Sequence, residues 1–177
     1  MSAVPTLISR DEALARIRNE VGNAPCLMCA MRDDRVGERW VVAEDADLLL
    51  VVPRYVRRWG QLLVVLKPHV TRYAQIEPRL WARANAWALR AATLVERMFE
   101  PHRCYVTSTG SAAGELTQSS AHLHIHVVPV YDADDRPRDV FSWSEGVYVA
   151  ATEEWQTLTD RLREAWRRAA DRTDHAR

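Results

Sequence analysis

The stretch that decides the fold is residues 122–128, which read His-Leu-His-Ile-His-Val-Val. It contains half of the chain's 6 histidines, and they occupy every second position. Successive side chains of a β-strand point to opposite faces, so the pattern predicts a strand with His122, His124 and His126 on one face and apolar side chains toward the core. Three neighbouring imidazoles suit metal binding, or nucleophilic and acid–base chemistry, because histidine titrates close to neutral pH.

Two cysteines with Cys-x-x-Cys spacing, Cys26 and Cys29, form a second candidate site. Such a pair suits three roles: a zinc site, a redox couple, or two small core residues. With His69 and His122 the two thiols would complete a closed tetrahedral zinc set. The chain has only 3 cysteines, an odd number, which argues against a disulfide scaffold and favours a reducing compartment.

Hydrophobic periodicity and turn signals predict helices that alternate with groups of strands. The expected helices are 10–21, 78–99 and 152–172, and the expected strands are 39–43, 48–52, 61–66, 104–109, 122–128 and 148–150. This order predicts an α+β fold with an antiparallel sheet. Because no domain boundary is visible, we expect one domain over residues 1–177, with its core at about 20–170.

Composition and charge exclude several classes of protein. The 177 residues include 24 basic and 24 acidic side chains, and a net charge of zero argues against a nucleic-acid coat or a polybasic membrane binder. The longest apolar run, 48–53, is far too short to cross a bilayer. The first residues lack the apolar region of a secretory signal, so we expect a soluble, cytoplasmic protein without nucleic-acid or membrane partners.

The sequence resembles the histidine-triad (HIT) family, whose members hydrolyse or transfer nucleotides, and in particular its Hint-like, zinc-containing bacterial branch. The resemblance lies in residues 122–128 and in the preceding Gln-Ser-Ser-Ala of 118–121. It extends to the Cys-x-x-Cys of 26–29 and to Val-Val-Leu-Lys-Pro-His at 64–69. It implies a HIT-like fold: a sheet of about five antiparallel strands, a long helix packed on it, and helices near both termini.

The resemblance also implies a mechanism and a set of site residues. His124 would attack the α-phosphorus of a nucleotide and form a covalent nucleotidyl-histidine, and His126 would donate to a phosphate oxygen or the leaving group. His122 completes the catalytic triad and, with Cys26, Cys29 and His69, would bind one structural zinc per chain. A homodimer with a nucleotide-like substrate is implied too. The implied phosphate-binding residues are Ser108, Gly114, Gln118 and Ser119.

Two of the chain's departures from the family pattern bear most on substrate binding. Family members usually carry an acid before the proline that corresponds to Pro53, where it holds the ribose hydroxyls, and this chain has none there. Three arginines follow instead, and we expect them to bind phosphate or another anion, with a solvated loop as the alternative. They are Arg54, Arg57 and Arg58. The second departure is an apparent insertion of residues 115–117 in the phosphate loop.

The function expected from the sequence is therefore cleavage of a phosphate-linked nucleotide, either a phosphoramidate or a dinucleoside polyphosphate. Two alternatives stay open. One is a metal-dependent enzyme that uses the three histidines as an open metal site. The other is a HIT-like binding or scaffold protein with little turnover.

Overall fold

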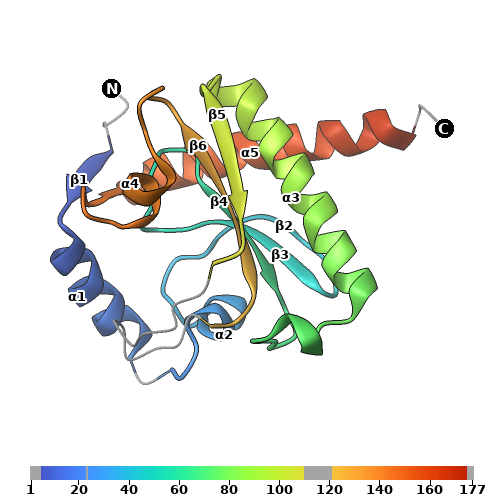
Figure 1. Cartoon of the computed structure of the whole chain (residues 1–177), viewed down its shortest axis with the longest axis horizontal. Helices are drawn as coiled ribbons and strands as arrows, with labels where there is room; N and C mark the ends of the chain where they lie inside the picture. The colour runs from blue at the N-terminus through green and yellow to red at the C-terminus, as the bar shows by residue number, and fades with distance from the viewer. Residues whose placement is uncertain (1–4, 23, 110–120, 175–177) are drawn as a thin grey trace.

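A five-stranded antiparallel sheet forms the centre of the computed structural model, which describes residues 5–22, 24–109 and 121–174. The strands lie in the order β2-β3-β4-β6-β5, so β6 is an inner strand and β2 and β5 are the edges. The predicted α+β class with an antiparallel sheet is confirmed (Figure 1). The strands are β2 Trp40–Glu44, β3 Leu48–Val52, β4 Leu62–Leu66, β5 Arg103–Thr107 and β6 His124–Val130.

Two long helices cover one face of this sheet. They are α3, Pro78–Phe99, and α5, Thr152–Asp174, and their bounds agree closely with the sequence prediction. Buried alanines of α3 pack against alternate strand residues such as Leu50, Val64 and Ile125. The small side chains let the helix lie close to the sheet, and the residues on both sides of this contact are buried.

The other face of the sheet carries shorter elements (Figure 1). Leu49 and Val65, which alternate with the residues facing α3, pack against Met28 of a short helix. β3 and β4 are therefore buried on both faces, which explains their unbroken runs of Leu and Val. The helices near this face are α1 Arg10–Val21, α2 Leu27–Arg32 and α4 Pro137–Phe141.

Four short elements were not predicted from the sequence. One is β1, Thr6–Ile8, which pairs in a separate two-stranded sheet with β7, Val147–Val149, the strand expected at 148–150. The other three are α2, α4 and the 3-10 turn η1, Tyr73–Gln75. Elements of three to six residues contain too few side chains to show a period, and their formation depends on contacts distant in the sequence.

The start of β6 differs from the prediction. The strand begins at His124, not at His122, and the residues before it leave the ladder. The backbone N–H of Leu123 instead donates to the carbonyl of Val70 at 2.7 Å. His122 therefore lies outside the ladder of β6, so its ring does not have to share the face of the sheet that carries His124 and His126.

Within the described ranges, no helix is both long and apolar enough to cross a membrane.

Aromatic contacts hold α5 to the rest of the protein. Trp155, which is only 3% exposed, stacks on Trp59 with ring centroids 4.8 Å apart. Trp59 belongs to the loop that follows β3, so this stack fixes that loop against α5.

We predict that Trp155→Ala lowers the free energy of unfolding by about 3–5 kcal/mol, because the change leaves a large cavity under α5. Urea denaturation followed by circular dichroism measures the loss. Gln156→Ala, an exposed neighbour on the same helix, is the matched control and should change stability by less than about 0.5 kcal/mol. A Trp155→Ala loss below 1 kcal/mol would show that the stack contributes little.

Candidate active site and metal centre

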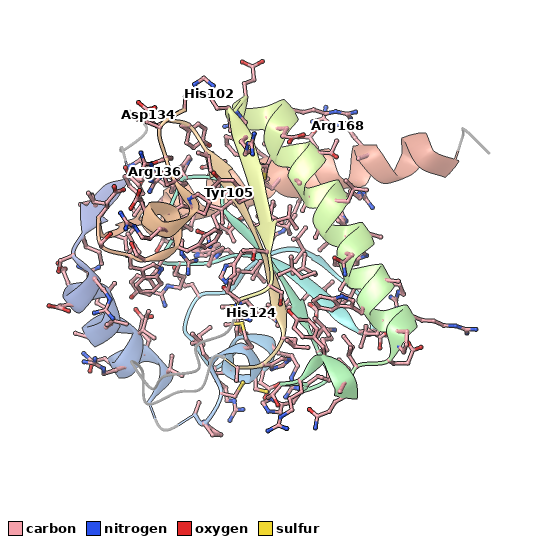
Figure 2. All side chains as sticks on the ribbon, in the orientation of Figure 1. His102, Tyr105, His124, Asp134, Arg136 and Arg168 are labelled. Carbon is pink, nitrogen blue, oxygen red and sulfur yellow. The ribbon has the colours of Figure 1, made fainter. Side chains whose placement is uncertain are left out.

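His124 and His126 lie side by side on β6, on the face turned away from α3. Register places them opposite Val65 and Leu63 of β4, and these belong to the face that packs on α2. The two histidines are 4% and 6% exposed, so both imidazoles are nearly excluded from water. Figure 2 labels His124 in the lower half of the molecule and His102 at its top.

Hydrogen bonds fix the orientation of the His124 ring. Its Nδ1 lies 2.8 Å from the backbone carbonyl of His122, which only accepts, so Nδ1 carries the proton. The remaining nitrogen, Nε2, then holds a lone pair and lies 3.0 Å from Nε2 of His126. A neutral imidazole with a free Nε2 is the form in which histidine acts as a nucleophile.

The other ring nitrogen of His126, Nδ1, lies close to two polar side chains from the loop between β3 and β4. Arg57 Nη1 and Gln61 Nε2 each lie 3.4 Å from His126 Nδ1. The backbone N–H of Arg57 also donates to Gln61 Oε1 at 2.9 Å, which ties the two residues together. Gln61 is almost completely buried and was not identified from the sequence.

Burial sets the protonation of both histidines. Removal from water lowers the pKa of His124, and it lowers the pKa of His126 well below the ordinary 6.5, with the charges of His124 and Arg57 adding to the effect. Burial also lowers the pKa of Arg57 to about 10, which still leaves its guanidinium charged at pH 7. The site at neutral pH is therefore two neutral imidazoles beside one permanent cation.

The ring of His122 faces the cysteine pair instead of the other two histidines. Its Nδ1 lies 3.6 Å from Cys26 Sγ and 3.5 Å from Cys29 Sγ, and Cys29 Sγ lies 3.2 Å from His69 Nδ1. All four ligand atoms lie within 4.8 Å of one another. Ligand atoms of a tetrahedral zinc with bonds of 2.0–2.3 Å are about 3.5 Å apart, so these spacings suit zinc.

The hydrogen bond of the other ring nitrogen of His122 fixes the tautomer in which Nδ1 can bind a metal. Its Nε2 lies 2.8 Å from the carbonyl of Leu66, so Nε2 carries the proton and the Nδ1 lone pair faces the thiols. Burial, followed by the charge of His69, lowers its pKa to about 4, which keeps the ring neutral. Neither ring nitrogen of His122 therefore contacts His124 or His126, and its contribution to His124 comes through its backbone carbonyl.

A cavity of about 370 Å³ opens in front of His124 and His126. One part of its wall is polar, formed by His124, His126 and Arg57, and the rest is largely apolar. The apolar wall comes from α1 and from the segment after α4, through residues such as Ile17 and Trp143. A cavity of this size with convergent polar groups at one end is typical of a small-molecule site.

A second polar group lies on the α1 side of the cavity. Glu20 accepts a hydrogen bond from Tyr55 Oη at 2.6 Å and forms an ion pair with Arg54 Nη2 at 3.2 Å. The carboxylate of Glu20 raises the pKa of Tyr55, as does burial, which is the larger cause. The sequence offered no signal for Glu20, because it lies on a helix remote from the strands that carry the histidines.

The three arginines of the loop have different surroundings. Arg58 is held by Asp135 at 2.8 Å and by Glu145 at 3.2 Å, so its guanidinium is already neutralised. Arg54 is paired with Glu20 and also donates to the carbonyl of Val36. Arg57 alone among them contacts one of the two buried histidines of β6, and within the described ranges it forms no ion pair. Of the three guanidiniums, Arg57 is therefore the one placed to meet an anion beside His126.

The expected phosphate-binding residues are only partly visible. Ser108 donates through Oγ to the carbonyl of His124 at 2.8 Å, which places it next to the catalytic pair. Gly114, Gln118 and Ser119, and the insertion at 115–117, lie outside the described residues.

Comparisons with known proteins agree with this geometry. A family model of the HIT domain matches residues 35–133, which include β2 to β6 and α3. Among solved structures, the fold is similar to that of a hypothetical histidine triad nucleotide-binding protein from Sulfolobus tokodaii. The TM-score is 0.64 at 19% identity, over 81% of this chain and 93% of that one.

Two further structures have the same fold. A Zn-bound histidine triad family protein from Mycobacterium smegmatis matches with a TM-score of 0.62 at 20% identity, over 82% of this chain and 96% of that one. A Hit-like protein from Bartonella henselae matches with a TM-score of 0.59 at 19% identity, over 76% of this chain and 90% of that one. A comparison with curated protein sequences gave no match.

We predict that the free energy of unfolding falls as the pH drops below about 6.5, and that His126 contributes to the fall. The unfolded chain takes up a proton on this residue near pH 6.5, whereas the folded chain, with its depressed pKa, does not. Stability from His126 is therefore fully present above pH 6.5 and is lost toward the folded-state pKa. Urea denaturation at pH 7.5, 6.5 and 5.5 should show a shallower dependence for His126→Gln.

The exposed His102 provides the control for this titration. His102→Gln should leave the pH dependence of wild type unchanged. Equal slopes for His126→Gln and wild type would contradict the assignment of a buried, neutral His126.

Proposed function

The chain belongs to the HIT domain family, and from that premise we propose that it is a nucleotide hydrolase or nucleotidyl transferase. It would cleave a phosphate-linked nucleotide at the α-phosphate through a covalent intermediate on His124. The observation that carries the proposal is the single orientation of His124, with Nδ1–H bonded to the His122 carbonyl and Nε2 exposed to the cavity side of β6. The nucleotide-binding name of the Sulfolobus tokodaii structure supports the substrate class.

The first step would join His124 Nε2 to phosphorus while the bond from phosphorus to the leaving group breaks. Because the ring is already held in place, little orientational entropy is lost in reaching the attack geometry. His126 would donate its N–H to a phosphoryl oxygen, and Arg57 would place a positive charge beside the same oxygens. In the second step, water or another acceptor would displace His124 and release the nucleoside monophosphate or its transfer product.

The geometry argues against a metal bound openly by the three histidines. His122 directs its Nδ1 toward Cys26 and Cys29, while His124 and His126 direct their Nε2 atoms toward each other. The imidazoles therefore do not converge on one point. The binding-protein alternative predicts nucleotide binding without turnover, since it needs the cavity but not the nucleophile.

We further propose that Cys26, Cys29, His69 and His122 hold one zinc ion with a structural role. The Zn-bound Mycobacterium smegmatis structure supports the choice of metal. Four protein ligands leave no open position, so bound zinc would supply rigidity and not activate water. It would join α2, the turn after β4 and the start of β6 into one unit.

Two expectations from the sequence stay proposals. We propose a homodimer, for which the exposed Leu89 of α3 and Val106 of the edge strand β5 offer apolar surface. We also propose a cytoplasmic location, since a reducing compartment keeps the two ligand thiols available to zinc.

His124→Ala should lower kcat on the best nucleotide substrate by at least about 10³-fold while leaving the circular dichroism spectrum unchanged, because the nucleophile is lost. Wild-type protein quenched during turnover should carry the mass of one nucleotidyl group, and the variant should carry none. Activity is measured by chromatography of the nucleotide products.

The exposed His102 serves again as the matched control, and His102→Ala should retain full activity. If His124→Ala keeps near wild-type turnover, the covalent mechanism is wrong. If wild type turns over no phosphate-linked nucleotide but binds nucleoside monophosphate, the binding-protein alternative is correct.

Protein purified without chelators should contain about one zinc per chain by elemental analysis, and removal of the metal should lower the melting temperature. A Cys26→Ser, Cys29→Ser double variant should lose the zinc and melt at the temperature of the metal-free protein. Cys104 lies on β5 and is the one cysteine outside the proposed centre, so Cys104→Ser is the control and should keep the zinc. Zinc-free protein, or a double variant that melts like wild type, would reject the proposed centre.

A further inference from the structure

We propose that Arg57 and Gln61 hold His126 as a neutral imidazole with its proton on Nε2, and that the site therefore favours substrates whose leaving group departs as an anion. The chemical class is a phosphoanhydride, such as a dinucleoside polyphosphate, in preference to a phosphoramidate. The inference rests on the proposed nucleotidyl chemistry of His124 and selects between its two substrate classes. Arg57 and Gln61 are positioning residues in this scheme, because they act through His126.

The orientation of the Gln61 amide gives the first step. Its Oε1 accepts the backbone N–H of Arg57 at 2.9 Å, so its amide nitrogen is the atom that faces His126. The guanidinium of Arg57 contains only N–H donors and no acceptor atom. Both groups within 3.4 Å of His126 Nδ1 are therefore donors, and Nδ1 must hold a lone pair.

The proton of His126 is then on Nε2, and the rest of the network agrees with that assignment. Nε2 of His126 lies 3.0 Å from Nε2 of His124, which has a lone pair because its own proton is on Nδ1. One N–H therefore lies between the two rings, and it points from His126 to His124. No other placement of protons satisfies all of these contacts.

Arg57 also opposes a second proton on His126. Its guanidinium carbon lies 5.5 Å from the ring centre of Phe141 and 5.6 Å from that of Trp143, so the cation is packed between aromatic faces. Its Nε is buried and has no hydrogen-bond partner in the described part of the chain. A positive charge in these surroundings is poorly screened, so an imidazolium on His126 would be strongly disfavoured.

This protonation state decides which leaving groups are accommodated. When His124 Nε2 bonds to phosphorus, the electron pair of the breaking bond goes to the leaving atom. In a phosphoanhydride that atom is an oxygen of a phosphate, which departs as an anion and needs no proton. In a phosphoramidate it is a nitrogen, which must gain a proton in order to leave as an amine.

A neutral His126 is a poor source of that proton, because releasing it would produce an imidazolate anion. It is well suited to a second task, which is to donate its N–H to a phosphoryl oxygen once substrate displaces the contact with His124. Arg57 supplies the positive charge that a protonated histidine would otherwise supply. The pair thus stabilises charge on the phosphate but does not protonate the leaving group.

Nitrogen NMR of protein labelled with ¹⁵N-histidine tests the tautomer directly. Wild type at pH 7 should show His126 with an unprotonated Nδ1 and a protonated Nε2, and the His126→Gln variant assigns the signal. Gln61→Glu should convert the ring to an imidazolium, since a carboxylate at this position accepts a hydrogen bond from Nδ1–H and its negative charge favours the protonated ring. Arg138→Gln removes an arginine whose side chain is 86% exposed and pairs with Asp139, and it should leave the signal unchanged.

Kinetics with a dinucleoside polyphosphate and a nucleoside phosphoramidate test the consequence. Wild type should have a kcat/KM at least about tenfold higher for the anhydride. Gln61→Glu should shift the ratio of the two kcat/KM values toward the phosphoramidate by about 10–100-fold, because it restores an acidic imidazolium. Arg138→Gln should leave both values unchanged.

Two results would overturn the proposal. One is a wild-type His126 that is protonated on Nδ1, and the other is faster cleavage of the phosphoramidate than of the anhydride. Turnover of neither substrate would instead reject the proposed function, and the ¹⁵N signals of wild-type His126 would still decide the tautomer. The tautomer measurement on wild type needs no variant, so a Gln61→Glu protein that fails to fold does not remove the test.

Discussion

The pairing of β6 with β4 on one side and β5 on the other is the constraint on which the site depends. Ladder pairing fixes Leu63 opposite His126 and Val65 opposite His124. Because side chains alternate along a strand, a shift of one residue would turn both imidazoles toward α3 and expose the apolar residues between them. The apolar residues Ile125 and Val127 are buried against the long helices, so the hydrophobic effect keeps the register that points the histidines toward the cavity.

His122 joins two functions at the point where the chain leaves that strand. Its ring faces the cysteine pair, and its carbonyl accepts the hydrogen bond that orients His124. A metal bound at the four ligands would therefore restrain the carbonyl that sets the tautomer of His124. Such a metal would influence the proposed chemistry of His124 without contacting a substrate.

The cavity is lined by segments inside and outside the range that matches the HIT domain. Its reactive end comes from strands within residues 35–133, the range that matches the HIT domain. Much of its remaining wall comes from outside that range, through α1 with Glu20 and through the segment that contains Trp143. The histidine end of the cavity thus lies within the matched range, whereas part of the opposite wall lies outside it. The buried charge of Arg57 links the two parts, since it contacts both His126 and Trp143.

The sequence by itself determined the sheet, the two long helices and the set of histidines and cysteines that bear chemistry. Those features follow from local rules, because periodicity records which face is buried and Cys-x-x-Cys spacing puts two thiols within one turn. Only the tertiary structure decided what each residue faces. It placed His122 in the cluster with the two cysteines and paired His124 with His126, and it distinguished Arg57 from the neutralised Arg58. It also brought in Gln61 and Glu20, which no pattern indicated. Such assignments depend on contacts between residues distant in the sequence, and the packing of helices and loops against the sheet determines those contacts.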